Sequence, residues 1–265
     1  MIDSIESVYN QESFDDELEL IVCDDSSTDD SLITLKVLAQ KYNFTLLVNS
    51  DNRGVGYTKN RLIENSNGNW FVFLDSDDRF ALNCIYNLCL KINQNQCNDV
   101  SMIYGNSFKL HDDGRSFEWK RSKSINGNLL LSKFEYPIFH PVIYNRKKYD
   151  LTEGIDISLK SADDFDLWYK MEEVGNIVFL DEPLYYYRIN LNGVSQVGDN
   201  YQKWVEVMLE HAYCHANAAR RRNIDVRDEL NTFSLAITQK LLKVQQKYRL
   251  KNRAKQLIKC LLNGG

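Results

Sequence analysis

The first hundred residues alternate between short hydrophobic runs and segments whose hydrophobic positions have helical spacing. The runs are "LELIVC" (18–23), "FTLLVNS" (44–50) and "NWFVFL" (69–74), and each has the length and residue types of a buried strand. The segments between them open with Ser, Asp or Gly, which are common where helices begin. This alternation predicts an α/β fold, with a mainly parallel sheet flanked by helices.

Beyond residue 98 the pattern changes, because strand-like runs follow one another with fewer helices between them. The order of elements predicts an α/β domain over residues 1–198 and a helical C-terminal extension over residues 199–265. Within this stretch we expect a hairpin over 99–121, a strand over 140–149, a helix over 163–175, two short strands divided near Pro183, and helix from about residue 200 onward.

Composition places the chain among ordinary globular proteins. Of its 265 residues 43% are hydrophobic and 26% are charged, and the net charge of -5 does not favour a nucleic-acid partner. The first residues lack the pattern of a signal peptide, and no apolar run approaches the ~20 residues that a membrane span needs. The six cysteines form no C-x-x-C pair. These features predict a cytoplasmic protein.

Acidic residues follow two of the three predicted strands. Asp24 and Asp25 come directly after the first run, and Asp75, Asp77 and Asp78 come after the third. The carboxyl ends of parallel strands share one edge of a sheet, where α/β proteins bind ligands. Mg2+ and Mn2+ offset the repulsion between clustered carboxylates, and they complete their coordination with water and phosphate oxygens. The clusters therefore predict a metal site, with a solvated turn of helix-capping aspartates as the alternative.

Five segments in the same order and spacing resemble the family 2 glycosyltransferases of the GT-A fold. They are "DDSS", "GVGYTKN", "FLDSDD", "DDFDLW" and "PLYYYR", and the likeness spans roughly residues 2–198. A lone D-x-D is a weak motif, whereas the ordered set is specific. The resemblance implies a GT-A-like (Rossmann-like) domain that uses Mn2+ or Mg2+ and a nucleotide-diphosphate sugar, with a UDP-sugar favoured. It implies a glycan or a lipid-linked molecule as acceptor.

The chemistry that the resemblance implies needs a base and a cation. In this comparison Asp164 matches the general base that takes a proton from the acceptor hydroxyl, and Asp77 with Asp75 matches the metal-binding pair. One base without an enzyme nucleophile implies a single displacement and inversion at the anomeric carbon. Capping of the helix that follows is the alternative role for Asp163. The competing class is a non-catalytic relative that binds nucleotides or glycans, or acts as a scaffold. A nucleotidyltransferase on a similar fold is a third, weaker option.

The resemblance also implies which side chains contact the nucleotide-sugar. Asp25 matches the carboxylate at the nucleotide base, and Asp75 matches a residue near the ribose. The set for the nucleotide-sugar is Asp25, Lys59, Asn60, Asp75 and Ser76.

A second group of matches falls on the acceptor and diphosphate side. These are Asp163, Trp168, Lys170 and Arg188. His140, in "FHPVIY", has two interpretations from sequence alone: it lines the acceptor cleft, or it is a satisfied core histidine.

The chain departs from the family at its start. Members begin with a buried strand that ends in Pro-x-Tyr-Asn, and "SVYNQ" (7–11) mimics that ending, but only thirteen residues separate Asn10 from Asp24. We therefore expect the family's first strand to be absent, which would leave a gap between the strands that end at Cys23 and Leu74. Each buried backbone group left unpaired costs ~1–3 kcal/mol. The expectation is that the recorded start is internal or that the protein is a degenerate relative.

A strongly basic segment lies near the C-terminus. Residues 240–259 contain eight Lys and Arg side chains and no acidic one. One interpretation is a peripheral contact with an anionic membrane, on its inner face. The favoured alternative is a solvated helix that packs on the catalytic domain or on a second subunit of a homodimer.

Overall fold

The computed structural model describes residues 1–12, 18–94, 99–111, 113–125, 137–189 and 200–243. The chain divides into two compact units, Met1–Gly193 and Val194–Gly265. Sequence predicted a division at 198/199; that the first unit carries catalysis remains a prediction.

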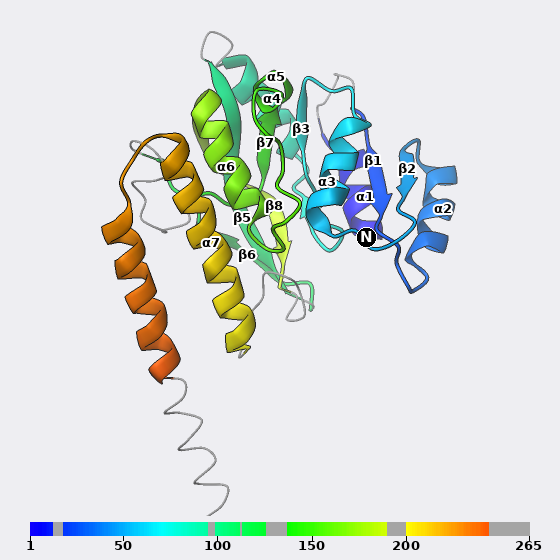
Figure 1. The fold of residues 1–265 in the computed structure, drawn as a ribbon. Coiled ribbons are helices and arrows are strands. Elements are labelled where there is room, and N and C mark those ends of the chain that lie inside the picture. The colour runs from blue at the N-terminus through cyan, green and yellow to red at the C-terminus, as the bar shows by residue number, and fades with distance from the viewer. Residues whose placement is uncertain (13–17, 95–98, 112, 126–136, 190–199, 244–265) are drawn as a thin grey trace, which may run out of the picture. The chain divides into compact units, whose positions relative to one another are not determined.

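The first unit begins with the predicted alternation of helix and strand (Figure 1). Its β1 and β2 pair in parallel as a two-stranded sheet, with Ile21 opposite Thr45. Side chains of α1 and α2 pack on this sheet around the buried Ile5 and Leu35. The elements are α1 (Ile2–Tyr9), β1 (Ile21–Asp24), α2 (Ser31–Lys41), β2 (Thr45–Val48) and α3 (Val55–Glu64).

The rest of the first unit is built on a six-stranded sheet with the order β3-β7-β5-β8-β4 and with β6 on β5. Its strands are β3 (Trp70–Val72), β4 (Arg79–Phe80), β5 (Val100–Leu110), β6 (Ser116–Trp119), β7 (Val142–Asn145) and β8 (Asn176–Arg188). The helices that accompany them are α4 (Cys84–Gln94), α5 (Arg146–Tyr149) and α6 (Asp163–Val174).

This sheet is mixed, which corrects the prediction of mainly parallel strands within an otherwise confirmed α/β fold. The pairings give β3, β5 and β8 one direction and β4, β6 and β7 the other. Short connections without a crossover helix follow β3 and β5, which allows β4 and β6 to run opposite to them. The carboxyl ends of β3 and β8 still share one edge of the sheet.

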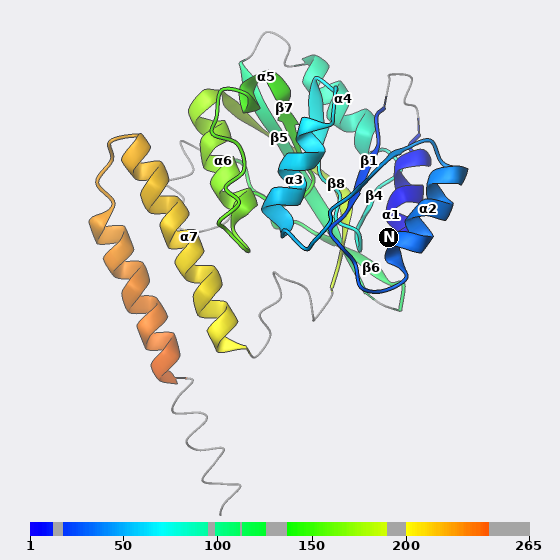
Figure 2. The ribbon, with the colours of Figure 1, turned by 45° about the vertical axis from the view of Figure 1, so that its right-hand side comes forward.

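Helices α4 and α6 cover opposite faces of the six-stranded sheet (Figures 1 and 2). On β7, Ile143 packs in the cluster that includes Cys84 and Leu88 of α4. The next residue, Tyr144, accepts a hydrogen bond from Trp168 of α6. Neighbouring strand residues point to opposite faces, so the central strand β5 is buried on both sides.

The hairpin expected over 99–121 is present as β5 and β6, with Gly114 in the turn at a φ of 82°. The two strands expected on either side of Pro183 are instead one strand, β8. Pro183 lies opposite Asn106, where the β5–β8 register shifts on both sides. A proline has no N–H to donate, and such an irregularity allows the strand to continue through it.

Strands β1 and β3 belong to different sheets, and no strand in the described ranges pairs with both. Sequence predicted that the strand between them is absent from this chain.

The second unit consists of helices in its described part. Helix α7 (Tyr201–Arg221) begins with the Asn200 side chain accepting a hydrogen bond from the Lys203 amide at 3.1 Å, and a second helix covers 227–243. The uninterrupted helix predicted from sequence is therefore broken, with Asn223 in the left-handed region. Of the basic segment, residues 244–259 lie outside the described residues.

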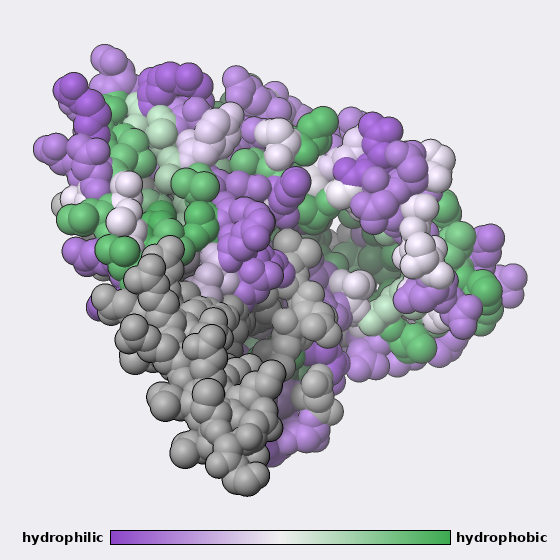
Figure 3. Space-filling model, turned by 60° about the horizontal axis from the view of Figure 1, so that its bottom comes forward, coloured by the Kyte–Doolittle hydropathy of each residue, from purple (hydrophilic) through white to green (hydrophobic). Residues whose placement is uncertain are grey.

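None of the helices described is both long and apolar enough to span a membrane. In the coloured part of Figure 3, hydrophobic side chains form separate groups among hydrophilic ones.

Candidate active site

The acidic turn, residues 75–78, follows β3 and is closed by a hydrogen bond from the Asp78 amide to the Asp75 carbonyl at 3.1 Å. Exposure is graded along it: Asp75 and Ser76 are exposed, Asp77 is half-buried, and Asp78 is 2% exposed. The Ser76 carbonyl accepts a hydrogen bond from Ser4 of α1 at 2.8 Å. The two carboxylates predicted to bind metal thus lie on the accessible side of the turn.

Strand β8 holds this turn in place through three hydrogen bonds. The Arg188 amide donates to Asp78 Oδ1 at 2.7 Å, Arg188 Nε donates to the Asp77 carbonyl at 2.9 Å, and the Asp75 amide donates to the Tyr185 hydroxyl at 3.3 Å. Burial raises the pKa of Asp78 to about 7, although hydrogen bonds from the Arg188 amide and Tyr185 lower it. Sequence analysis missed the roles of Asp78 and Tyr185, because nothing in the run of three tyrosines indicates which one faces the turn.

The acidic turn fits one mode of metal binding. No group of three or more His, Cys, Asp or Glu side chains in the described part of the chain is placed to hold a metal ion. Mg2+ and Mn2+ are instead commonly held by one or two carboxylates together with substrate phosphates. The hard oxygen donors of Asp75 and Asp77, on a turn that β8 fixes, suit that mode.

The start of α6 carries the second acidic pair. Asp163 Oδ2 is 2.7 Å from Lys59 Nζ, and both side chains are largely buried. Ala162 occupies the cap position of α6, so Asp163 binds Lys59 and does not cap the helix. Asp164 is half-buried, and one of its oxygens accepts a hydrogen bond from the Phe165 amide at 2.8 Å.

Electrostatics join Lys59 to both acidic clusters. Burial alone would lower the pKa of Lys59, but Asp163, Asp164 and Asp75 raise it above its ordinary value, so the ammonium stays charged. Burial and the Asp163 carboxylate raise the pKa of Asp164 to about 6, while Lys59 and the Phe165 amide lower it. Three of the predicted carboxylates thus act on the charge of the predicted lysine.

These groups line a small cleft together with apolar and aromatic side chains. Its polar lining consists of Lys59, His140, Asp163 and Asp164. The remaining lining residues are Phe73, Val142, Tyr144, Ile155 and Leu167.

Asp25 belongs to a different cluster, at the start of α3. Its carboxylate accepts hydrogen bonds from the amides of Arg53 and Gly54, both at 2.9 Å, and from the Asn49 side chain at 2.7 Å. Burial raises the pKa of Asp25, but these bonds outweigh it, so the pKa is below its ordinary value. Asn49 in turn accepts a hydrogen bond from Arg61. Asp25 therefore orders the loop that leads into α3, and it is not among the residues that line the cleft.

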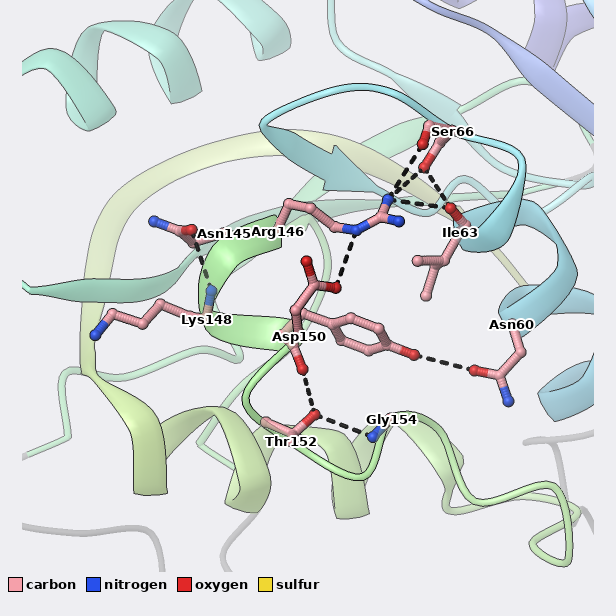
Figure 4. Close-up of polar contacts among 10 residues, drawn as sticks. Asn60, Ile63, Ser66, Asn145, Arg146, Lys148, Asp150, Thr152 and Gly154 are labelled. Carbon is pink, nitrogen blue, oxygen red and sulfur yellow. Dashed lines mark hydrogen bonds and ion pairs between the residues drawn. The ribbon is translucent and has the colours of Figure 1, made fainter.

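Asn60 connects three parts of the first unit, and Figure 4 shows its contact with α5. Its Oδ1 accepts a hydrogen bond from the Tyr149 hydroxyl of α5, and its Nδ2 donates to the Ile155 carbonyl, both at 3.0 Å. Close by, Arg146 of α5 donates to the Ile63 carbonyl near the end of α3 at 3.0 Å. The Asn60 side chain, predicted to bind the nucleotide, thus joins α3 to α5 and to the loop before α6.

Two residues predicted for the acceptor and diphosphate side are buried in the interior. Trp168 Nε1 donates to the Tyr144 hydroxyl at 3.0 Å, so it touches a cleft residue without lining the cleft itself. Lys170 Nζ lies 2.6 Å from Asp166 and donates to the Gly154 carbonyl at 2.9 Å. Arg188 is different, because it contacts the acidic turn directly.

Comparison with known proteins defines the family. The model of "Glycosyl transferase family 2" matches residues 1–152, more than half of the chain, and the chain belongs to this family. A chondroitin synthase from Escherichia coli is 26% identical over 193 residues, a match that covers 68% of this chain and 26% of that relative. The chain thus spans about a quarter of the length of that relative.

Solved structures show the GT-A fold. Residues 1–349 of S. aureus TarS in complex with UDP-GlcNAc superpose with a TM-score of 0.61 at 21% identity, covering 80% of this chain and 65% of that one. The mannosyltransferase PcManGT from Pyrobaculum calidifontis, in complex with GDP-Man and Mn2+, gives a TM-score of 0.58 at 14% identity and covers 96% of this chain and 75% of that one.

Proposed function

We propose that this chain carries the catalytic domain of an inverting, metal-dependent glycosyltransferase. It moves a sugar from a nucleotide-diphosphate sugar, with a UDP-sugar favoured, to a hydroxyl of a glycan or lipid-linked acceptor in the synthesis of a polysaccharide or cell-surface glycan. The observation that carries this proposal is the electrostatic grouping of Asp75, Asp163 and Asp164 around Lys59. This grouping links Asp75, on the predicted donor side, to Asp164, the predicted base.

Asp164 is the proposed general base. A carboxylate whose pKa is about 6 is ionised at neutral pH and is more basic than an ordinary aspartate. Its neighbour Asp163 is bound to Lys59, which leaves Asp164 as the carboxylate of this pair that accepts the proton of the acceptor hydroxyl. A single base that activates the acceptor, with no covalent enzyme intermediate, gives inversion at the anomeric carbon.

The acidic turn is the proposed donor side. Asp77, together with Asp75, would hold Mn2+ or Mg2+, which when bound stabilises the negative charge of the departing diphosphate. Strand β8 keeps these two residues at the carboxyl edge of the sheet, and Arg188 adds a positive charge beside the turn. The Mn2+ in the PcManGT complex is consistent with this assignment.

Turnover of a panel of UDP-sugars tests the proposal. Wild type, Asp77→Ala and Asp164→Asn are incubated with Mn2+ and each donor, and released UDP is measured; Asp228→Asn, at an exposed site on the second unit, is the matched control. We expect turnover in wild type and in the control, and its loss in the other two. Binding of donors without turnover under every condition would support the competing class, a catalytically impaired binding or scaffold protein.

The partners beyond the donor are also proposals. For a cytoplasmic enzyme with a lipid-linked acceptor, the basic segment 240–259 is the candidate for contact with the inner face of a membrane, and a homodimer contact is its alternative. Flotation with anionic vesicles compares the full chain with a variant in which the basic residues of 240–259 are replaced by Gln. Equal flotation of the two would overturn the membrane contact.

A further inference from the structure

His140 lies on the wall of the cleft, and the mechanism above gives it no role. Its imidazole lines the cleft beside Lys59, Asp163 and Asp164. Among the described residues, no hydrogen bond to either ring nitrogen is found, so the interpretation as a satisfied core histidine does not hold there. A half-buried imidazole with free hydrogen-bonding capacity is able to bind a ligand at this point of the cleft.

The backbone and the ring plane of His140 are both fixed. Ser107 Oγ donates to the His140 carbonyl at 2.5 Å, and the Gly105 amide donates to the Pro141 carbonyl at 3.0 Å. The imidazole stacks on Tyr185, with ring centroids 5.3 Å apart and an interplanar angle of 27°. These contacts orient the ring and leave its nitrogens for a ligand.

Charges from both acidic clusters act on His140. The charges that act on it are Asp75 from the acidic turn, Asp163 from α6 and Lys59 from α3. Tyr185, on which the ring stacks, also receives the hydrogen bond from the Asp75 amide. Burial and Lys59 lower the pKa of His140, although Asp75 and Asp163 act to raise it. A neutral imidazole has one N–H donor and one acceptor nitrogen, a pair that suits sugar hydroxyls.

We propose that His140 hydrogen-bonds a hydroxyl of the sugar that is transferred and thereby contributes to the choice of donor sugar. This inference rests on the proposed function, in which the diphosphate lies at the acidic turn and the acceptor hydroxyl lies at Asp164. The reacting sugar must bridge those two places. His140 is a fixed polar side chain that lines the cleft beside Asp164 and stacks on Tyr185, which binds the acidic turn. The nucleotide lies beyond the diphosphate, so His140 contacts the sugar and not the UDP.

Binding of UDP and of UDP-sugars separates this role from a structural one. Calorimetry in the presence of Mn2+ measures Kd for UDP, UDP-glucose and UDP-N-acetylglucosamine with wild type, His140→Phe and His140→Gln. Phe keeps an aromatic ring to stack on Tyr185 but cannot hydrogen-bond, whereas Gln keeps a donor and an acceptor. We expect His140→Phe to bind UDP as wild type does and to bind the preferred UDP-sugar about tenfold more weakly. His140→Gln should recover part of the loss.

Two results would overturn the inference while leaving the proposed function intact. One is a wild type that discriminates UDP-sugar from UDP while His140→Phe retains the full UDP-sugar affinity. The other is an equal loss of affinity for UDP and UDP-sugar, which would identify a purely structural role; thermal unfolding of each variant confirms that it is folded. A folded wild type that binds and turns over no nucleotide-sugar would instead contradict the proposed function itself.

Discussion

Helix α6 takes part in two buried Lys–Asp ion pairs of nearly equal length that have different surroundings. Lys59–Asp163 joins α3 to the start of α6 at 2.7 Å, with side-chain exposures of 15% and 7%. Lys170–Asp166 lies within α6 at 2.6 Å, with exposures of 7% and 4%. The first pair lines the cleft beside Asp164, whereas the second binds the Gly154 carbonyl in the interior.

The difference shows that the chemistry of an ion pair does not define its role. Burial of two opposite charges gives little net stability, but removal of one partner leaves an uncompensated charge. In the interior, the cost of that uncompensated charge lowers the stability of the folded protein. At the cleft the same charges also act on Asp164, because burial and Asp163 raise its pKa while Lys59 lowers it. The first pair should therefore affect activity and the second should affect stability.

The largest effect is expected for a substitution of Asp164, the carboxylate beside the Lys59–Asp163 pair. Asp164→Asn removes the proposed base and keeps the shape of the side chain, so kcat should fall by about 10²–10⁴. Donor affinity, measured by calorimetry, should change little because the acidic turn is intact. Wild-type kcat in this variant would show that another group accepts the proton.

Removal of the metal should have the next largest effect. Treatment with EDTA, or the substitution Asp77→Ala, should lower turnover at least about a hundredfold, because the diphosphate charge loses its stabilisation. Added Mn2+ should restore the EDTA-treated wild type but not Asp77→Ala. Full turnover in EDTA would contradict metal dependence.

The role of the interior pair, Lys170–Asp166, is tested by measuring the stability of the protein. Lys170→Met leaves Asp166 buried without its cation and should lower the free energy of unfolding by about 3–5 kcal/mol, measured by urea denaturation. The double variant Asp166→Leu/Lys170→Met removes both charges and should recover most of the loss. The kcat of the folded fraction should stay near that of wild type. A large fall in kcat would instead support a role for Lys170 on the acceptor side, as its match to the family predicted.

The smallest effect is expected in the pH dependence of kcat/KM, which tests whether the cleft ion pair and the interior ion pair differ in their influence on Asp164. Asp164 acts as a base only when ionised, so kcat/KM should fall as the pH drops through about 6. Lys59→Met removes a charge that lowers this pKa, so the acidic limb should move to higher pH. Lys170→Met is the matched control and should leave the limb in place. A limb that is the same in all three proteins would show that Lys59 does not set the charge of Asp164.

Sequence patterns predicted the elements better than their pairing. The alternation of strand and helix over residues 18–74 was confirmed because hydrophobic spacing is a local property, as was the position of the hairpin turn at Gly114. The directions of β4 and β7, and the separation of β1 from the main sheet, depend on contacts between distant segments. A one-dimensional pattern carries no direct signal for those contacts.

In the candidate site, too, local features could be predicted from the sequence, whereas contacts between distant segments could not. The spacing of the acidic residues indicated the turn and the start of α6, but it did not show which face of α3 or α6 each side chain takes. Asn60 and Trp168 therefore matched a motif, although their polar atoms bind neighbouring elements. For Lys170 a usable signal was present, since an Asp four residues earlier is a common ion-pair partner on a helix.

Helix α3 has a consequence for the energetics of the whole domain. Along ten residues its backbone and side chains bind Asp25 through Gly54, Asp163 through Lys59, and the α5 region through Asn60 and Ile63. Substitutions in elements that share such a rigid connector are expected to be non-additive, even where they do not touch one another. We therefore predict that ligand binding at the Asp25 end and events at Asp164 are thermodynamically linked, and double-mutant cycles across α3 measure the coupling energy.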